Sequence, residues 1–244
     1  MTTLVTAAGR RLPRGWAHLG LQFVIWIGFY VAYQVARGLA DHGGTATAFA
    51  NGRWVIERER DLHSLVELPL QKAIDGSNVL IQATSWTYWL SQFAVVAGTL
   101  LWVYFRAHDR FLRLRDTLIA ANLIGLVGYV LFPTAPPRMF PEAGFQDTLA
   151  EHATVNHSSA AVAISSNPYA AMPSLHSADS LIVGVTMALV VRSWWAKALW
   201  LAWPVWVWFS VMATGNHFWL DIAAGVLVAG VAALLVARWR RRTA

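Results

Sequence analysis

The sequence predicts an all-helical integral membrane protein in which six helices cross the bilayer. Three observations support this fold class. Hydrophobic residues make up 57% of the 244-residue chain and charged residues only 13%, whereas a typical soluble domain is about 25% charged. The apolar residues gather in blocks of about 20, the length that a helix needs to cross a bilayer. Most charged residues fall between the blocks, as in loops. We therefore expect a single membrane domain over residues 1–244.

Six apolar blocks are long enough to be spanning helices. The first, HLGLQFVIWIGFYVAYQVA, follows Arg10, Arg11 and Arg14, so a cleavable signal peptide is the alternative. Its apolar run is longer than the roughly 7–15 residues of a signal peptide's hydrophobic region, which favours a retained span. The expected spans are residues 17–37, 79–105, 114–132, 174–192, 195–213 and 218–238.

Two long segments separate the spans on one side of the membrane. In residues 38–78, apolar positions such as Trp54, Leu62 and Val66 alternate with mixed charges. This pattern predicts a helix over residues 54–76 that lies at the membrane interface, and a solvated loop helix fits it equally well. Residues 133–173 are rich in Pro, Ser and Ala, and we expect them to cover part of the bundle.

The distribution of the basic residues predicts the orientation. If the N-terminus is cytoplasmic, 13 of the 19 Lys and Arg residues lie on the inner side and six on the outer side. This bias favours cytoplasmic termini in the cell membrane. The net charge of +6 is thereby explained as a topology signal, and we expect no nucleic-acid partner. The oligomeric state is left open.

The first polar cluster, FPTAPPRMF, lies where the third span ends. Its prolines stop the helix and stiffen the exit from the membrane. Arg138 is the only basic residue of the segment between the third and fourth spans. It is a candidate phosphate ligand, because its planar guanidinium matches phosphate oxygens. The alternative is an interfacial arginine that reaches toward lipid headgroups.

The second cluster, NPYAAMPSLHSAD, opens the fourth span. Ser174 and His176 fall in its first turn, where unpaired backbone N–H groups and the helix dipole favour an anion. His176 alone could equally be a hydrogen-bonded interface histidine.

The third cluster, ATGNHFWLDIAAG, opens the sixth span. His217 and Asp221 are four residues apart, which on a helix places them on one face. A carboxylate that accepts a proton from one imidazole nitrogen leaves the other nitrogen able to attack. An unpaired carboxylate one turn inside an apolar helix would be costly, so a functional pair is favoured.

All three clusters fall on the same face of a six-span bundle, and with cytoplasmic termini that face is the outer one. The sequence has no cysteine and no closely spaced carboxylates of the kind that bind metals, so we expect no metal and no cofactor. This combination indicates metal-free phosphoryl transfer. His217 would attack phosphorus, and His176 would act as general acid and then base. Arg138, Ser174 and two helix N-termini would stabilise the phosphate charge.

The motifs AAMPSLHSA and TGNHFWLD resemble the second and third signature motifs of the type 2 phosphatidic acid phosphatase (PAP2) superfamily. The segment PTAPPR is similar to the first motif of its inositol phosphotransferase branch, which includes inositol phosphorylceramide synthases. The resemblance covers roughly residues 110–235. It implies a PAP2-like helical bundle, a catalytic triad of His176, His217 and Asp221, Arg138 as phosphate ligand, and a membrane lipid substrate with a phosphate headgroup.

The chain departs from the phosphatase forms of these motifs. Leu131 stands where the phosphatase motif has a lysine, Leu175 where it has a glycine, and Val211 where it has an arginine. Two cations are therefore missing, and phosphate binding depends more on Arg138. These departures favour a lipid phosphotransferase over a lipid or prenyl pyrophosphate phosphatase. A transporter or channel is the alternative from another class, although we see no chain of polar residues through the spans.

Three further residues are candidates for acceptor binding or support of the site. Asp179 could orient His176 or bind a polyol acceptor, or be satisfied by a neighbouring helix. Asn216 could donate to phosphate or cap the sixth helix. Tyr169 lies just upstream of the second motif.

Overall fold

The computed structural model describes residues 13–39, 44–152 and 168–243. This part of the chain is helical, and its only β-type pairing is a parallel bridge between Thr134 and Ala170. The basic residues Arg10 and Arg11, and residues 153–167 of the segment before the fourth predicted span, lie outside the described residues.

Each predicted span corresponds to an observed helix whose ends lie within two residues of those expected, with two exceptions. The third starts six residues earlier, and the sixth ends five residues later. The second is one run divided by a short π-helical segment, η1. In chain order they are α2 (Gly15–Leu39), α5–η1–α6 (Asn78–Leu90, Ser91–Val95, Val96–Arg106), α7 (His108–Leu131), α10 (Leu175–Val190), α11 (Trp194–Ala213) and α12 (Trp219–Thr243).

Five of these runs are long and apolar enough to cross a membrane, and the chain is a multi-pass membrane protein. The exception is α10, an apolar helix of 16 residues. At 1.5 Å per residue it is about 24 Å long, shorter than the roughly 30 Å hydrocarbon core. A sixth crossing by α10 therefore remains a prediction.

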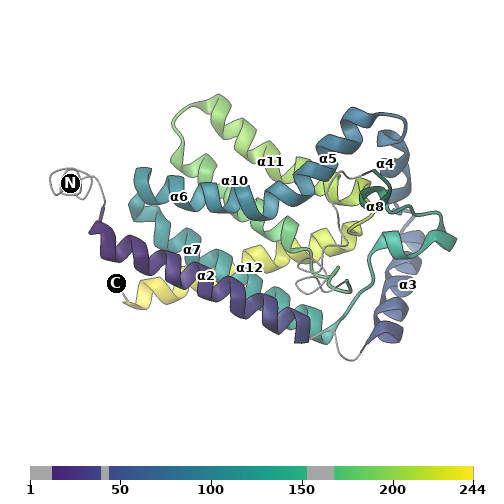
Figure 1. The fold of residues 1–244 in the computed structure, drawn as a ribbon, viewed down its shortest axis with the longest axis horizontal. Coiled ribbons are helices and arrows are strands. Elements are labelled where there is room, and N and C mark those ends of the chain that lie inside the picture. Colours follow the sequence, from purple (N-terminus) through teal and green to yellow (C-terminus); the bar gives the residue numbers. More distant parts are fainter. Residues whose placement is uncertain (1–12, 40–43, 153–167, 244) are drawn as a thin grey trace.

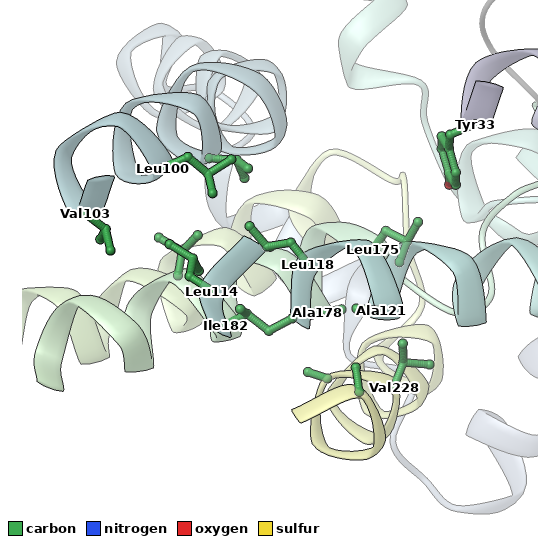
Figure 2. Packing of buried hydrophobic residues seen from close by; sticks show 14 of the residues in the cluster. Tyr33, Leu100, Val103, Leu114, Leu118, Ala121, Leu175, Ala178, Ile182 and Val228 are labelled. Carbon is green, nitrogen blue, oxygen red and sulfur yellow. The ribbon is translucent and has the colours of Figure 1, made fainter. Parts of the chain in front are cut away.

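The helix α10 lies at the centre of the bundle, where it packs against α6, α7, α11 and α12. Its central place explains its apolar composition on all sides, with Ala178 and Val183 fully buried. Figure 2 shows Leu175, Ala178 and Ile182 among side chains of α6, α7 and α12 that form the largest buried cluster. This packing holds the start of α10 in place.

Two further helices form a cap at the end of the bundle where α10 and α12 begin, and the start of α2 and the end of α12 lie at the opposite end (Figure 1). They are α3 (Thr45–Asp61) and α4 (Glu67–Ile74). We predicted one helix over residues 54–76. The chain instead begins the first helix at Thr45 and breaks it after Asp61, with His63 in the left-handed region at φ 53°.

The cap packs on the bundle through one face. In α3 the residues Gly52, Val55 and Ile56 are buried, whereas Trp54 is 48% exposed. A Cβ at Gly52 would lie 2.8 Å from the Ala135 carbonyl oxygen, so this close contact requires glycine. The location of the cap at a membrane interface remains a prediction.

Candidate active site

A cavity of about 690 Å³ opens where the three polar clusters meet. Its lining includes Arg138, His176 and His217, together with Asp179 and Asn216. The expectation that the clusters share one end of the bundle rested on counting membrane crossings. The structure brings these side chains to a single cavity.

Arg138 is held by the loop that precedes α12. It lies in a single 3-10 turn (Pro137–Met139), and its backbone N–H donates to the Gly215 carbonyl at 2.8 Å. Its guanidinium donates to the Asn216 Oδ1 atom at 2.7 Å and lies 3.6 Å from the Asp147 carboxylate. An arginine side chain held in one place in this way suits phosphate recognition better than it suits a loose contact with lipid headgroups.

In the structure Asn216 contacts Thr214 and Arg138, and its roles as a phosphate donor or a helix cap stay predictions. Its Nδ2 donates to the backbone and side-chain oxygens of Thr214, and its Oδ1 accepts from Arg138. The amide group therefore orients the guanidinium. The sequence alone gave no sign of this, because the contact joins residues 78 positions apart.

His176 is the second residue of α10 and follows Ser174, the N-cap of that helix. The imidazole ring stacks on Tyr88 with 4.4 Å between the centroids, and its Nε2 lies 3.2 Å from the Tyr88 carbonyl oxygen. Because a carbonyl only accepts, this contact assigns the proton to Nε2. Ser174 is fully buried, and its Oγ accepts from the Ser177 N–H at 3.3 Å.

His217 lies in the turn between α11 and α12. Its Nδ1 is 2.9 Å from the Ala171 carbonyl oxygen and 3.4 Å from Asp221 Oδ2. Both neighbours are acceptors, so the proton resides on Nδ1 and the lone pair on Nε2. The His217 and His176 ring centroids are 5.6 Å apart.

The predicted contact between His217 and Asp221 is present, but its geometry differs from the one expected. Because α12 begins only at Trp219, the two residues do not share a helix face. Asp221 is fully buried, and its Oδ2 accepts from the Phe218 N–H at 2.8 Å. The carboxylate therefore caps the first turn of α12 and faces His217 at the same time.

Two residues that the sequence analysis missed complete this turn. Glu67 Oε1 accepts from the Trp219 N–H at 2.7 Å, and Glu59 Oε1 accepts from the Leu220 N–H at 3.1 Å. Two carboxyl groups thus accept from the first two amides of α12, and Asp221 accepts from the amide just before them. These contacts leave fewer amides of α12 open to a phosphate, and the role of this N-terminus in phosphate binding stays a prediction.

Burial raises the pKa of both glutamates well above the usual range, and the negative charge of Asp221 adds to the effect. For Glu59 the neighbouring Glu67 carboxyl raises the pKa further. Hydrogen bonds from the α12 backbone act in the opposite direction but do not offset the burial.

Asp179 is buried deeper along α10 and is held by two neighbouring helices. Its carboxylate accepts from Gln92 Nε2 at 2.9 Å and from Asn122 Nδ2 at 3.0 Å. Gln92 belongs to the π-helical segment, a feature that often marks functional sites. This arrangement does not involve a hydrogen bond to His176. Tyr169 lies outside the cavity lining, where its hydroxyl accepts from Thr45 at 3.2 Å.

Within the described residues no group of three His, Cys, Asp or Glu side chains is placed to hold a metal ion. The cavity is instead lined by one arginine and two histidines, and the buried Asp221 faces His217 from outside the lining.

Residues 53–235 match the family model described as the PAP2 superfamily. The chain belongs to the PAP2 superfamily. The matched range contains Arg138, His176, His217 and Asp221, and also both glutamates of the cap. The resemblance seen in the motifs is therefore confirmed, and the protein is an enzyme of the phosphatase or phosphotransferase kind.

Among curated proteins, the chain is similar to the phosphoinositol dihydroceramide synthase of Bacteroides thetaiotaomicron. The two are 27% identical over 140 residues, which cover 52% of this chain and 46% of that relative. The chain thus matches less than half of the relative's length. No solved structure matches the chain. Superfamily and relative together support phosphoryl transfer or phosphatase activity on lipids.

Proposed function

We propose that this protein transfers a phosphate-linked headgroup from one membrane lipid to the hydroxyl of another, through a covalent phosphohistidine and without a metal ion. The observation that supports this most is the arrangement of Arg138, His176 and His217 around one cavity, with the two imidazole rings 5.6 Å apart. We further propose that the enzyme works in the cell membrane with cytoplasmic termini and an outward-facing site.

In the first step, His217 Nε2 attacks phosphorus while Arg138 binds the phosphate oxygens. The N–P bond forms, the bond between phosphorus and the departing lipid oxygen breaks, and His176 gives that oxygen its proton. Because His176 Nε2 donates to the Tyr88 carbonyl, His176 must start the cycle as an imidazolium with a second proton on Nδ1. Nδ1 gives this proton to the departing oxygen and takes one back from the incoming hydroxyl. Asp221 and the Ala171 carbonyl stabilise the positive charge that develops on His217.

In the second step, His176 accepts the proton of an incoming hydroxyl, whose oxygen attacks phosphorus. The P–N bond breaks and His217 is restored with its proton on Nδ1. The phosphate stays fixed by Arg138, which Asn216 holds in place through both steps. No redox partner or further reactant is required.

The cavity also suggests what the phosphate carries. Its volume of about 690 Å³ falls in the range of sites for whole organic ligands, and aromatic side chains such as Tyr30, Tyr33 and Tyr129 line it. Asp179 lies about 4.5 Å further along α10 than His176, at 1.5 Å per residue. We propose that its carboxylate accepts hydroxyl groups of a polyol attached to the phosphate. The synthase-named relative is consistent with an inositol headgroup.

Hydrolysis is the second candidate, because the superfamily match is described only at a level that includes phosphatases. Vesicles that contain the purified protein separate the two functions. Phosphatidylinositol labelled in its phosphate is supplied with a ceramide acceptor, and phosphatidic acid labelled in the same way is tested separately. We expect label in a new phosphodiester lipid, absent with His217→Ala. Label that appears only as free phosphate from phosphatidic acid would instead establish a phosphatase.

A further inference from the structure

The first turn of α12 is tied to the cap by two carboxyl groups that come from far away in the sequence. The Trp219 N–H donates to Glu67, 152 residues away, and the Leu220 N–H donates to Glu59, 161 residues away. The indole Nε1–H of Trp219 adds a third link, to Ser64 Oγ at 3.1 Å. These amides have no partner within their own helix, so the cap supplies the acceptors.

The environment of the two glutamates is unusual for a purely structural contact. Both side chains are fully buried, and the ion pairs seen among the described residues include neither of them. Beyond the interaction of the two carboxyl groups with each other, the second oxygen of each has no hydrogen-bond partner in this part of the chain. Buried carboxylates without a cation are costly, which predicts that the pair retains a proton.

We propose that Glu59 and Glu67 are positioning residues, which fix the first turn of α12 against the cap and thereby set the place of His217 at the cavity and of Asp221 beside His217. His217 lies two residues before Trp219, and Asp221 follows Leu220 directly. A shift of this turn moves the nucleophile relative to Arg138 and His176. The effect on turnover rests on the function proposed above, whereas the effect on the turn itself does not.

The protonation of the pair makes the positioning sensitive to pH. Burial, with repulsion from neighbouring carboxyls, raises the pKa of Glu67 to about 7 and that of Glu59 to about 9. The charged groups that act on the pair are the two glutamates themselves and Asp221 of α12. A carboxyl whose pKa rises on folding stabilises the folded state at low pH and loses that contribution as pH rises through the folded pKa. The contribution of this pair to stability should therefore fall as pH rises above the ordinary carboxyl pKa of about 4.5, and it should be lost by about pH 9.

Four variants test this proposal. Glu59→Gln keeps an oxygen that accepts from the Leu220 N–H, but its side chain cannot become charged. Glu59→Met and Glu67→Met remove the acceptor at similar size. Glu57→Gln is the matched control, because Glu57 lies on the same helix but is exposed. The measurements are amide hydrogen exchange of residues 216–225, the unfolding temperature in detergent from pH 6 to pH 9, and kcat and KM.

We expect each Met variant to speed exchange in residues 216–225 about five- to tenfold, the effect of a lost helix cap. Its kcat should fall about tenfold or more while KM changes less than threefold, because small misplacements of a reacting group cost rate. Glu59→Gln should keep the wild-type kcat at pH 7 and flatten the fall of unfolding temperature above pH 7. Glu57→Gln should match the wild type.

Unchanged amide exchange in both Met variants would overturn the proposal, as would a Glu59→Gln protein whose unfolding temperature falls with pH like that of the wild type. These two measurements need no substrate. If no lipid is turned over by the wild type, the proposed function fails while the positioning role is still decided by exchange and stability.

Discussion

The two helices that carry the site, α10 and α12, approach each other closely at Gly225. A Cβ at this position of α12 would lie 2.2 Å from the Ser174 carbonyl oxygen and 3.0 Å from Ser177 Cβ. The contact is with backbone at the start of α10, which cannot rotate away. Gly225→Ala therefore has to separate the two helices next to His176 and Asp221.

The magnitude follows from this geometry. Cβ contacts below 3.0 Å essentially do not occur, so the 2.2 Å contact has to lengthen by about 0.8 Å or more. Two hydrogen bonds join the helices at this seam, from the Ser174 N–H to the Asp221 carbonyl at 2.9 Å and from Ser177 Oγ to the Ile222 carbonyl at 3.2 Å. Overpacking typically costs about 1–3 kcal/mol. A misplacement of about 1 Å in a catalytic site can cost up to about 100-fold in rate.

The assay compares Gly225→Ala with Gly230→Ala, a substitution on the same helix whose Cβ meets nothing within 4 Å. Both variants gain the same helix propensity, so that effect cancels in the comparison. We expect Gly225→Ala to unfold at a lower temperature, by about 2–4 °C for each kcal/mol, and to lose at least about tenfold in kcat. Gly230→Ala should behave like the wild type. If Gly225→Ala also keeps the wild-type kcat and unfolding temperature, the helices are not in the close contact described.

Three further predictions concern the cavity. Arg138→Lys should raise KM and lower kcat/KM by about tenfold or more, because a lysine lacks the planar fork that pairs with two phosphate oxygens; steady-state kinetics with unchanged KM would exclude Arg138 as a phosphate ligand. Asp179→Asn should lower turnover of an inositol lipid more than hydrolysis of phosphatidic acid, because it weakens an acceptor for hydroxyl groups; equal losses on both substrates would assign Asp179 to the packing of Gln92 and Asn122 alone. Turnover should be unchanged after treatment with a chelator, and a loss that added metal restores would contradict the metal-free mechanism.

Much of the architecture could be predicted from composition alone. Long apolar blocks have few alternatives to a spanning helix, because backbone groups in lipid must find partners within the segment. The expected and observed ends therefore differ by few residues in most of these helices. The number of membrane crossings also predicted that Arg138, His176 and His217 lie at one end of the bundle. This prediction needs only the end of a helix at which each residue lies.

The details that the sequence did not predict depend on contacts between distant segments. Nothing near Glu59 or Glu67 indicates that the backbone of α12 is their partner, because their charges suit an exposed amphipathic helix equally well. The hydrogen bond from His217 to the Ala171 carbonyl likewise joins two turns 46 residues apart. The four-residue spacing of His217 and Asp221 predicts that both lie on one face of a helix, whereas α12 begins between them, at Trp219.

The direct test of the central claim is to trap the phosphate on His217. The protein is incubated with a lipid labelled in its phosphate, quenched without acid because phosphohistidine is acid-labile, and digested for mass spectrometry. The account predicts a phosphorylated or headgroup-phosphorylated His217 that is lost on addition of the acceptor, accumulates when His176→Ala slows its release, and is absent from His217→Ala. Turnover by the wild type without any modified His217, or label on a different residue, would contradict it.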